Sequence, residues 1–252
     1  MSPLTGVLRE AWAMYRNFAA HFLLIAFILY AFASIISGLL TGAFGVPGSA
    51  AAAVIDFFVM FLLQAALVKA VQDVRDGRVD LDLRGTLSAA VPYLLPVAGA
   101  SILAVIGIAV GFVFIIVPGL ILLTFWSLIV PCIVLGESPA LASFGRSWRT
   151  VRGYAWNVFG TIVLVWLILV AVRVVLALIF AVLPQWLRSS LADVVAGTLI
   201  APFIAIVVSL AYYRLTAAHQ NQAPPFDPPP EHPPPEHPPP GYTPPGGYPP
   251  AY

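Results

Sequence analysis

Long apolar segments, separated by short charged ones, make up most of this chain. A helix needs about 20 predominantly apolar residues to cross the ~30 Å hydrocarbon core of a bilayer. Between Gly85 and Gly136 there are 52 positions without an acidic or basic residue, enough for two crossings, with a Val-Pro-Gly turn at 117–119 between them. The complete pattern predicts six transmembrane helices, at residues 18–40, 50–71, 94–116, 119–136, 157–182 and 194–214.

Composition supports a membrane protein and argues against a water-soluble globule. Hydrophobic residues make up 60% of the chain and charged residues 9%, against about 25% charged residues in soluble domains. Such a chain lacks the polar side chains to cover its own surface, so lipid must cover much of it. The net charge of +1 predicts no attraction to nucleic acid.

The basic residues indicate an orientation. Loops that stay in the cytoplasm hold the excess of Lys and Arg. If the N-terminus is cytoplasmic, the outer segments hold only Arg188, and Arg173 lies within a span. The inner segments then hold the other ten of the twelve basic residues: Arg9, Arg16, Lys69, Arg75, Arg78, Arg84, Arg146, Arg149, Arg152 and Arg214. We therefore expect a multi-pass protein of the cell membrane with both termini in the cytoplasm.

The segment before the fifth span predicts an amphipathic interfacial helix. On a helical wheel Phe144, Trp148 and Val151 form one stripe, while Arg146, Arg149 and Arg152 lie on the other side. Ser138 followed by Pro139 is a sound helix start. A helix of this kind lies in the membrane surface, with its apolar side toward the acyl chains and its cations at anionic headgroups. Arg146, Arg149, Arg152 and Trp148 are therefore candidate contacts to anionic lipid.

The N-terminal segment has the same design. Leu4, Leu8, Ala11, Tyr15 and Phe18 share one face, and Arg9 and Arg16 lie away from it as further candidate lipid contacts. Residues 12–19 and 148–155 both read Trp-x-x-x-Arg-x-aromatic-Ala, and each segment precedes a predicted outward span. A fainter copy at 86–96 precedes the third span. The pattern suggests three repeats of an interfacial helix followed by a helical hairpin.

Residues 117–160 resemble a known bacterial membrane family. The shared features are a Pro-Gly turn, a span with Trp and Pro, an acidic residue at its inner end, then Arg-Ser-Trp and a basic-aromatic segment. Here they are Pro118, Gly119, Trp126, Pro131, Glu137, Arg146, Ser147, Trp148 and Arg152. In these features the chain resembles the membrane domain of glycerophosphoryl diester phosphodiesterases and related six-helix families. The resemblance implies the membrane part only, because the hydrolase of the fused proteins is a separate soluble barrel.

Arg173 and Asp56 are the candidate site within the membrane. An ionisable residue within a span is costly and usually faces a partner or a cavity. Both are predicted in the outer halves of their spans, so an ion pair between them is within reach. Such a pair could fix helix packing or lie beside a solute pathway, and Arg173 could instead extend its side chain to the membrane surface.

No pattern of catalytic or metal-binding residues stands out, so we expect neither an enzyme nor a cofactor. Residues 218–252 are rich in proline and predict a disordered cytoplasmic tail, either without a dedicated partner or as a ligand for an aromatic-lined protein groove. The sequence thus favours a non-enzymatic scaffold or accessory protein that handles lipids or envelope components. The alternative is a small-solute transporter or channel with Arg173 and Asp56 near its pathway.

Overall fold

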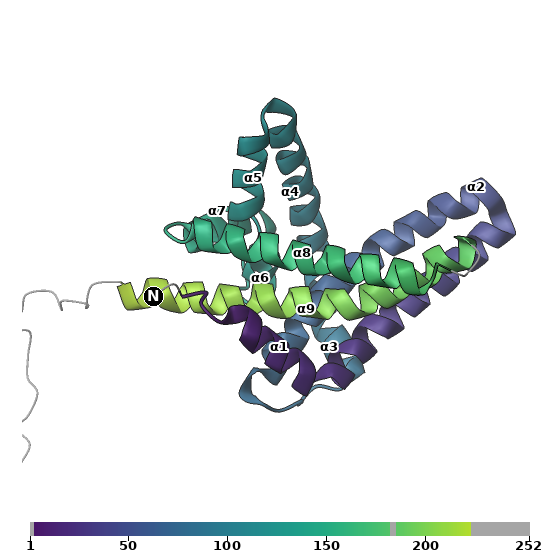
Figure 1. Cartoon of the computed structure of the whole chain (residues 1–252), viewed down its shortest axis with the longest axis horizontal. Coiled ribbons are helices and arrows are strands. Elements are labelled where there is room, and N and C mark those ends of the chain that lie inside the picture. Colours follow the sequence, from purple (N-terminus) through teal and green to yellow (C-terminus); the bar gives the residue numbers. More distant parts are fainter. Residues whose placement is uncertain (1–2, 182–184, 223–252) are drawn as a thin grey trace, which may run out of the picture.

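The computed structural model describes residues 3–181 and 185–222, and the regular structure in these ranges is helical (Figure 1). Two short 3-10 helices lie at Val74–Asp76 and Val91–Tyr93. The α-helices are α1 Val7–Asn17, α2 Ala19–Asp73, α3 Leu83–Ala90, α4 Leu94–Phe114, α5 Ile116–Phe125, α6 Ile129–Val134, α7 Ala140–Val151, α8 Ala155–Ile179 and α9 Gln185–Gln222. The expected all-α class is confirmed for the described residues.

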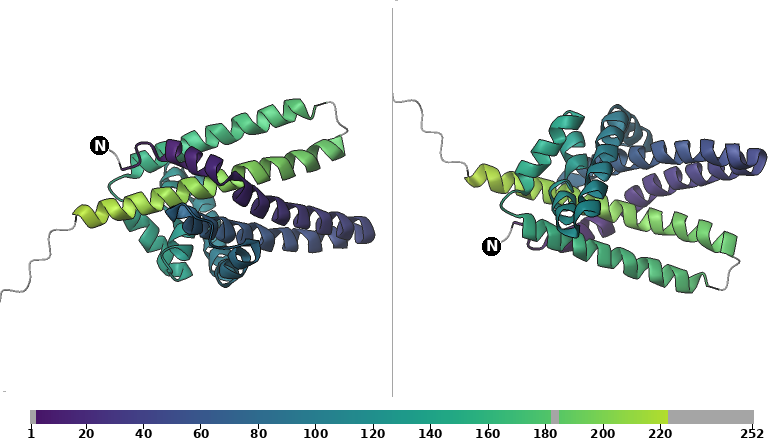
Figure 2. Two further views of the ribbon diagram at one scale, coloured as in Figure 1. Left: turned by 90° about the horizontal axis from the view of Figure 1, so that it is seen from below. Right: turned by 90° about the horizontal axis from the view of Figure 1, so that it is seen from above.

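Helix α2 is a hairpin. Gly45 interrupts it with φ 60° and ψ −129°, a conformation that glycine adopts readily because it lacks a Cβ. Pro47 follows two residues later. The chain reverses here, and the two limbs run side by side in Figures 1 and 2. The limbs correspond to the first two predicted spans, 18–40 and 50–71.

Five helical segments of the described chain are long and apolar enough to cross a membrane. They are Ala19–Asp73, which contains both limbs of α2, Leu83–Phe114, Ile116–Val134, Ala155–Ile179 and Val194–Asn221. Helices α4 and α8 end within three residues of the predicted spans 94–116 and 157–182. Helix α9 is longer than the predicted span 194–214 at both ends. It continues through residue 222, so the predicted tail at 218–252 begins as helix, and residues 223–252 lie outside the described residues.

Helix α9 lies at the centre of the arrangement. It packs most extensively along α2 and also contacts α1, α7 and α8. In Figure 2 the tip of the α2 hairpin and the facing ends of α8 and α9 lie at one end of the molecule. The α4–α5 hairpin points in another direction, and it stands upright across α8 and α9 in Figure 1.

Close packing of α4 on α5 depends on two glycines. A Cβ on Gly107 would lie 2.6 Å from the Trp126 ring, and one on Gly111 would lie 3.1 Å from the backbone of Gly119. Small residues at this spacing let membrane helices approach each other closely. Gly107 and Gly111 are therefore used for packing within the chain.

Much of the apolar surface has no protein covering it. In the most apolar window of α8, 0% of the residues are buried, and Trp156 is 85% exposed. The buried core instead gathers where the second limb of α2, α6 and α9 meet, around Leu67, Ile133 and Ile206. Surfaces of this kind are stable when hydrocarbon surrounds them.

Candidate functional site

The helix that follows the Pro-Gly turn is broken near its middle. Helix α5 ends at Phe125 and α6 begins at Ile129. Pro131 has no N–H, and its ring disfavours a regular helix through the preceding turn. The Ile129 N–H bonds the Trp126 carbonyl at 3.3 Å instead of the Phe125 carbonyl one helical turn back. The break therefore leaves the Phe125 carbonyl oxygen without its helical donor, inside a segment predicted to lie in hydrocarbon.

Helix α7 supplies the missing donor. The Ser147 hydroxyl donates to the Phe125 carbonyl at 2.6 Å. One residue earlier, Arg146 Nη1 donates to the Gly136 carbonyl at 2.7 Å and to Ser138 Oγ at 2.9 Å. A cation at the C-terminal end of a helix satisfies free carbonyls and interacts favourably with the helix dipole. Ser147 and Arg146 therefore hold α7 against the two halves of the broken helix.

The buried face of α7 differs from the face that the helical wheel predicts. The buried residues are Ser143, Ser147, Thr150 and Val151, and three of these are polar. The predicted apolar stripe also packs on the broken helix, where the Phe144 ring lies 5.0 Å from the Trp126 ring. Trp148 stacks on Phe125 with ring centroids 4.0 Å apart and is 39% exposed. The physical reason is that α7 packs on a broken helix, where buried hydroxyls can bond carbonyl groups that lack helical donors.

The three arginines of α7 therefore separate into two kinds. Arg146 is half-buried and bonded within the protein, and its contact with lipid stays a prediction. Arg149 and Arg152 are exposed and stay candidate contacts to anionic lipid. Helix α7 begins at Ala140 with Pro139 at its N-cap, and no side-chain cap is formed. Ser138, the expected cap, accepts from Arg146 instead.

Helix α1 agrees with its predicted faces. Leu4 and Ala11 are buried, whereas Arg9 and Arg16 are exposed. Burial raises the pKa of the Tyr15 phenol, which stays protonated and donates to the Leu199 carbonyl of α9 at 3.2 Å. Helix α1 thus packs into the protein through its apolar face.

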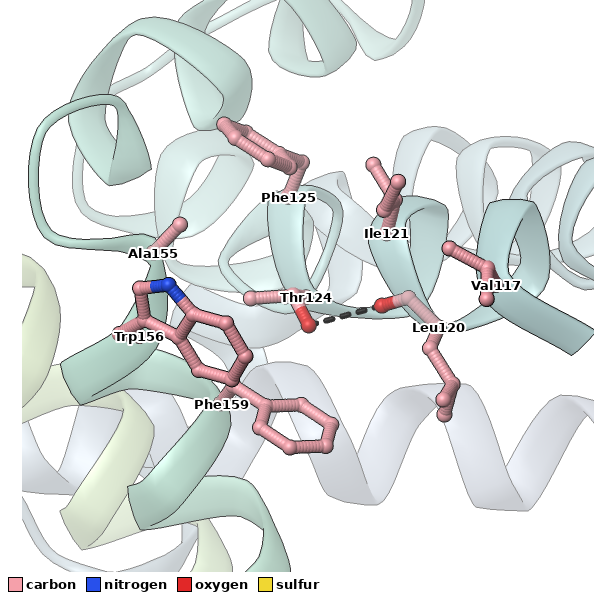
Figure 3. A pocket seen from close by; sticks show the side chains of 8 residues that line it. All are labelled: Val117, Leu120, Ile121, Thr124, Phe125, Ala155, Trp156 and Phe159. Carbon is pink, nitrogen blue, oxygen red and sulfur yellow. Dashed lines mark hydrogen bonds between the residues drawn. The ribbon is translucent and has the colours of Figure 1, made fainter.

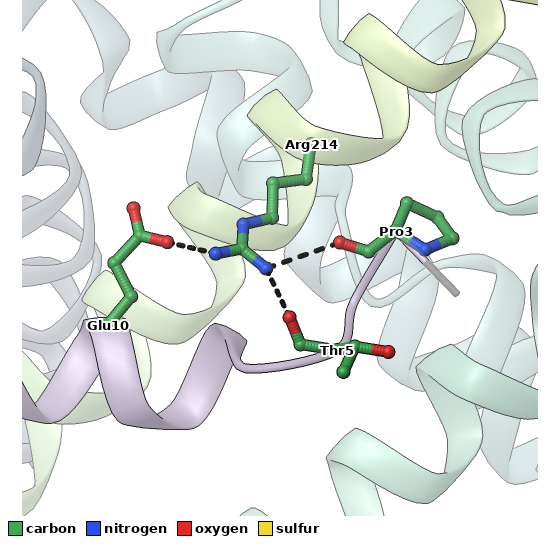
Figure 4. A network of polar contacts seen from close by, with 4 residues as sticks. All are labelled: Pro3, Thr5, Glu10 and Arg214. Carbon is green, nitrogen blue, oxygen red and sulfur yellow. Dashed lines mark hydrogen bonds and ion pairs between the residues drawn. The ribbon is translucent and has the colours of Figure 1, made fainter. Parts of the chain in front are cut away.

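A polar network joins α1 and the residues before it to Arg214 of α9 (Figure 4). Arg214 forms an ion pair with Glu10. Its Nη1 also donates to the Thr5 carbonyl at 2.8 Å and to the Pro3 carbonyl at 3.3 Å. Arg214, expected to mark the inner end of the last span, therefore also holds the N-terminal segment in place.

An apolar groove of about 510 Å³ lies between α5 and the start of α8. Figure 3 shows its lining side chains, of which Trp156 and Phe159 form one wall. Thr124 is the one hydroxyl-bearing residue of the lining, and its Oγ1 donates to the Leu120 carbonyl at 2.7 Å. The full lining is Val117, Leu120, Ile121, Thr124, Phe125, Ala155, Trp156 and Phe159. With no charged side chain in the lining, the groove suits a hydrocarbon chain and not an ion.

A second cavity, of about 340 Å³, lies where α2, α6 and α9 meet. Its lining includes Gln64 on the second limb of α2 and Ser127 at the helix break. Sequence reasoning missed both residues. The available signals were an amide within an otherwise apolar span and a serine four residues before a proline.

Asp56 and Arg173, the predicted intramembrane pair, belong to α2 and α8. Asp56 accepts a hydrogen bond from Ser37 Oγ at 2.7 Å, across the α2 hairpin. Helix α9 lies between α2 and α8 in both views of Figure 2, and the ion pair between Asp56 and Arg173 stays a prediction. Neither residue lines the groove or the α2–α6–α9 cavity. Among the described residues, no group of three His, Cys, Asp or Glu side chains could hold a metal ion.

Comparison with known proteins gives a family but not an activity. Residues 81–220 match the family described as a domain of unknown function, DUF7847. The chain belongs to this family. The matched region runs from just before α3 to near the end of α9, so it contains α7, the broken helix and the groove. No curated protein and no solved structure matches the chain. The resemblance to the phosphodiesterase membrane domain stays a prediction.

Proposed function

We propose that this protein is a non-enzymatic membrane protein that binds the acyl chain of an anionic lipid in the groove between α5 and α8. It would act as a scaffold or accessory protein in the handling of lipids or envelope components. The observation that supports this proposal is the groove itself. A volume of about 510 Å³ falls within the ~300–1,000 Å³ of ordinary ligand sites, and the lining has no charge that would reward an ionic solute.

Exposed groups near the groove suit a lipid headgroup. Trp156 is 85% exposed at the start of α8, where an aromatic ring is favoured at the boundary between hydrocarbon and headgroups. The exposed Arg152 lies four residues earlier, and Arg149 lies one helical turn before it. A lipid whose chain occupies the groove would therefore find cations near its phosphate. Arg9 and Arg16 on α1 would add to the same attraction.

The proposed topology has six spans and both termini in the cytoplasm of a cell membrane. The two limbs of α2, α4, the α5–α6 segment, α8 and α9 would be the spans. This assignment places ten of the twelve basic residues on the cytoplasmic side, as the positive-inside rule requires. A small-solute pathway through Asp56 and Arg173 has less support, because they lie outside the groove and the α2–α6–α9 cavity.

Photolabelling in nanodiscs tests the acyl-chain site. The full-length protein would be reconstituted with a phosphatidylglycerol that carries a diazirine on one acyl chain, and the cross-linked residues mapped by mass spectrometry. We expect labelling to concentrate at Ile121 and Phe159. Ala155→Trp places an indole in the groove and should lower this labelling several-fold. Ala142→Trp, at an exposed position of α7 outside the groove, is the matched control.

The headgroup preference is tested on the same preparation. Replacing both Arg149 and Arg152 with Gln should reduce the preference for phosphatidylglycerol over phosphatidylcholine, and high salt should do the same. Labelling spread evenly along α8, or unchanged by Ala155→Trp, would refute the groove as a lipid site. An unchanged lipid preference in the double variant would refute the role of the two arginines.

A further inference from the structure

The cavity between α2, α6 and α9 has a lining of mixed character that the proposed acyl groove lacks. Most of its residues are apolar, among them Leu63, Leu67 and Pro131. Gln64, Ser127 and Tyr30 bring hydrogen-bonding groups to it, and its lining has no charged side chain. A site of this composition would repel an ion, because no opposite charge offsets the cost of removing the ion from water.

Gln64 has unused hydrogen-bonding capacity. Its amide makes no hydrogen bond to another described residue, although Gln64 lies within an apolar limb of α2 and is half-buried. An amide offers two N–H donors and a carbonyl acceptor, and an amide without partners in hydrocarbon is costly. A ligand that pairs with Gln64 would remove that cost.

Ser127 adds acceptors on the other side of the cavity. Its hydroxyl donates to the Thr124 carbonyl at 2.8 Å, which leaves the hydroxyl oxygen free to accept. Its own carbonyl lacks the usual helical donor, because the residue four positions later is Pro131. The site thus combines an amide donor at Gln64 with acceptors at Ser127.

The cavity also reaches the outer surface of the protein. Met60 lines it and is 54% exposed, on a limb of α2 that we propose faces lipid. An apolar chain entering past Met60 would leave its polar end beside Gln64 and Ser127. At about 340 Å³ the cavity holds a polar group with the first part of a chain, not a whole lipid.

We propose that this cavity binds the uncharged hydroxyl end of a long-chain alcohol. The hydroxyl accepts from the Gln64 amide and donates to an oxygen of Ser127, while the chain extends past Met60. This site is separate from the groove between α5 and α8 and does not depend on it. The two sites also differ in chemistry, because the groove offers no unpaired polar side chain and would take hydrocarbon alone.

The test uses hexadecanol that carries a diazirine near its hydroxyl, with the full-length protein in nanodiscs. We expect cross-links within residues 60–68 and 127–131. Unlabelled hexadecanol should compete, whereas hexadecane and hexadecyltrimethylammonium should compete poorly. Gln64→Leu keeps the volume but removes the hydrogen bonds, and it should lower labelling about tenfold. Leu62→Met, an apolar exchange on the same limb of α2 outside the lining, should leave labelling unchanged.

Gln64→Asn separates binding from folding if the leucine variant does not fold. The shorter amide keeps the polarity of the position but draws the donor back from the cavity, so labelling should again fall. Equal labelling of the wild-type protein and a folded Gln64 variant would overturn the proposal. Equal competition by hexadecane and hexadecanol would also overturn it, because the site would then recognise only hydrocarbon. Hexadecanol cross-links found only at residues 117–125 and 155–159 would place the probe in the groove, and they would overturn the proposal as well.

Discussion

Arg146→Met should destabilise the α6–α7 unit far more than the same change at the neighbouring arginines. The substitution keeps an unbranched apolar stem but removes the hydrogen bonds to the Gly136 carbonyl and to Ser138 Oγ, of 2.7 and 2.9 Å. A hydrogen bond to a charged group contributes about 1.5–3 kcal/mol. Because one half-buried guanidinium nitrogen makes both bonds, we expect a loss of about 2–3 kcal/mol for the pair.

Cys132 provides the assay. It is the single cysteine of the chain and is 0% exposed, so a thiol-reactive dye labels it only when this region opens. Each 1.4 kcal/mol changes an equilibrium tenfold, so Arg146→Met should raise the labelling rate roughly 30- to 150-fold when reclosing is faster than labelling. Arg149→Met and Arg152→Met are matched controls at exposed positions and should change the rate little. Equal labelling of all three variants would show that Arg146 has no special structural role.

Two further predictions use the same assay or thermal unfolding in detergent. Gly107→Ala should lower the free energy of unfolding by about 1–3 kcal/mol, because its Cβ would lie 2.6 Å from the Trp126 ring. Gly99→Ala, where a Cβ meets nothing within 4 Å, should be neutral or slightly stabilising. Ser147→Ala should cost about 1–3 kcal/mol by leaving the Phe125 carbonyl without a donor, and labelling of Cys132 at the wild-type rate would contradict that role.

The positions of several long helices could be predicted because hydrocarbon imposes a simple rule on sequence. Helices α4 and α8 match the predicted spans closely, since each is a long apolar run with few charges. The break after Phe125 could be anticipated only as a kink at Pro131. Its exact extent depends on which carbonyls find other donors, and those donors lie on α7, in a later part of the sequence.

The candidate site was harder to predict, because a sequence does not show which groups will become hydrogen-bond partners. A helical wheel sorts residues by polarity, and on that basis Arg146 belonged with Arg149 and Arg152. The structure separates them because Arg146 lies beside the end of α6, whereas the other two face outward. Asp56 was considered only as a partner for Arg173, and the hydrogen bond that it accepts from Ser37 on the opposite limb of α2 was not foreseen. The cavity at Gln64 could not be foreseen, because it forms only where α2, α6 and α9 meet.

The repeated segments at 12–19 and 148–155 have a shared structural role that their arginines do not reveal. Each lies in a helix that donates a hydroxyl to a backbone carbonyl beside a proline-containing part of a span. Tyr15 donates to Leu199, three residues before Pro202, and Ser147 donates to Phe125 at the break. A carbonyl group without a donor is costly in hydrocarbon, so the broken span requires the hydroxyl of α7, whereas the Tyr15 bond fastens α1 to α9. Through these bonds α1 and α7 pack into the protein, while the exposed arginines on their outer faces stay available to lipid.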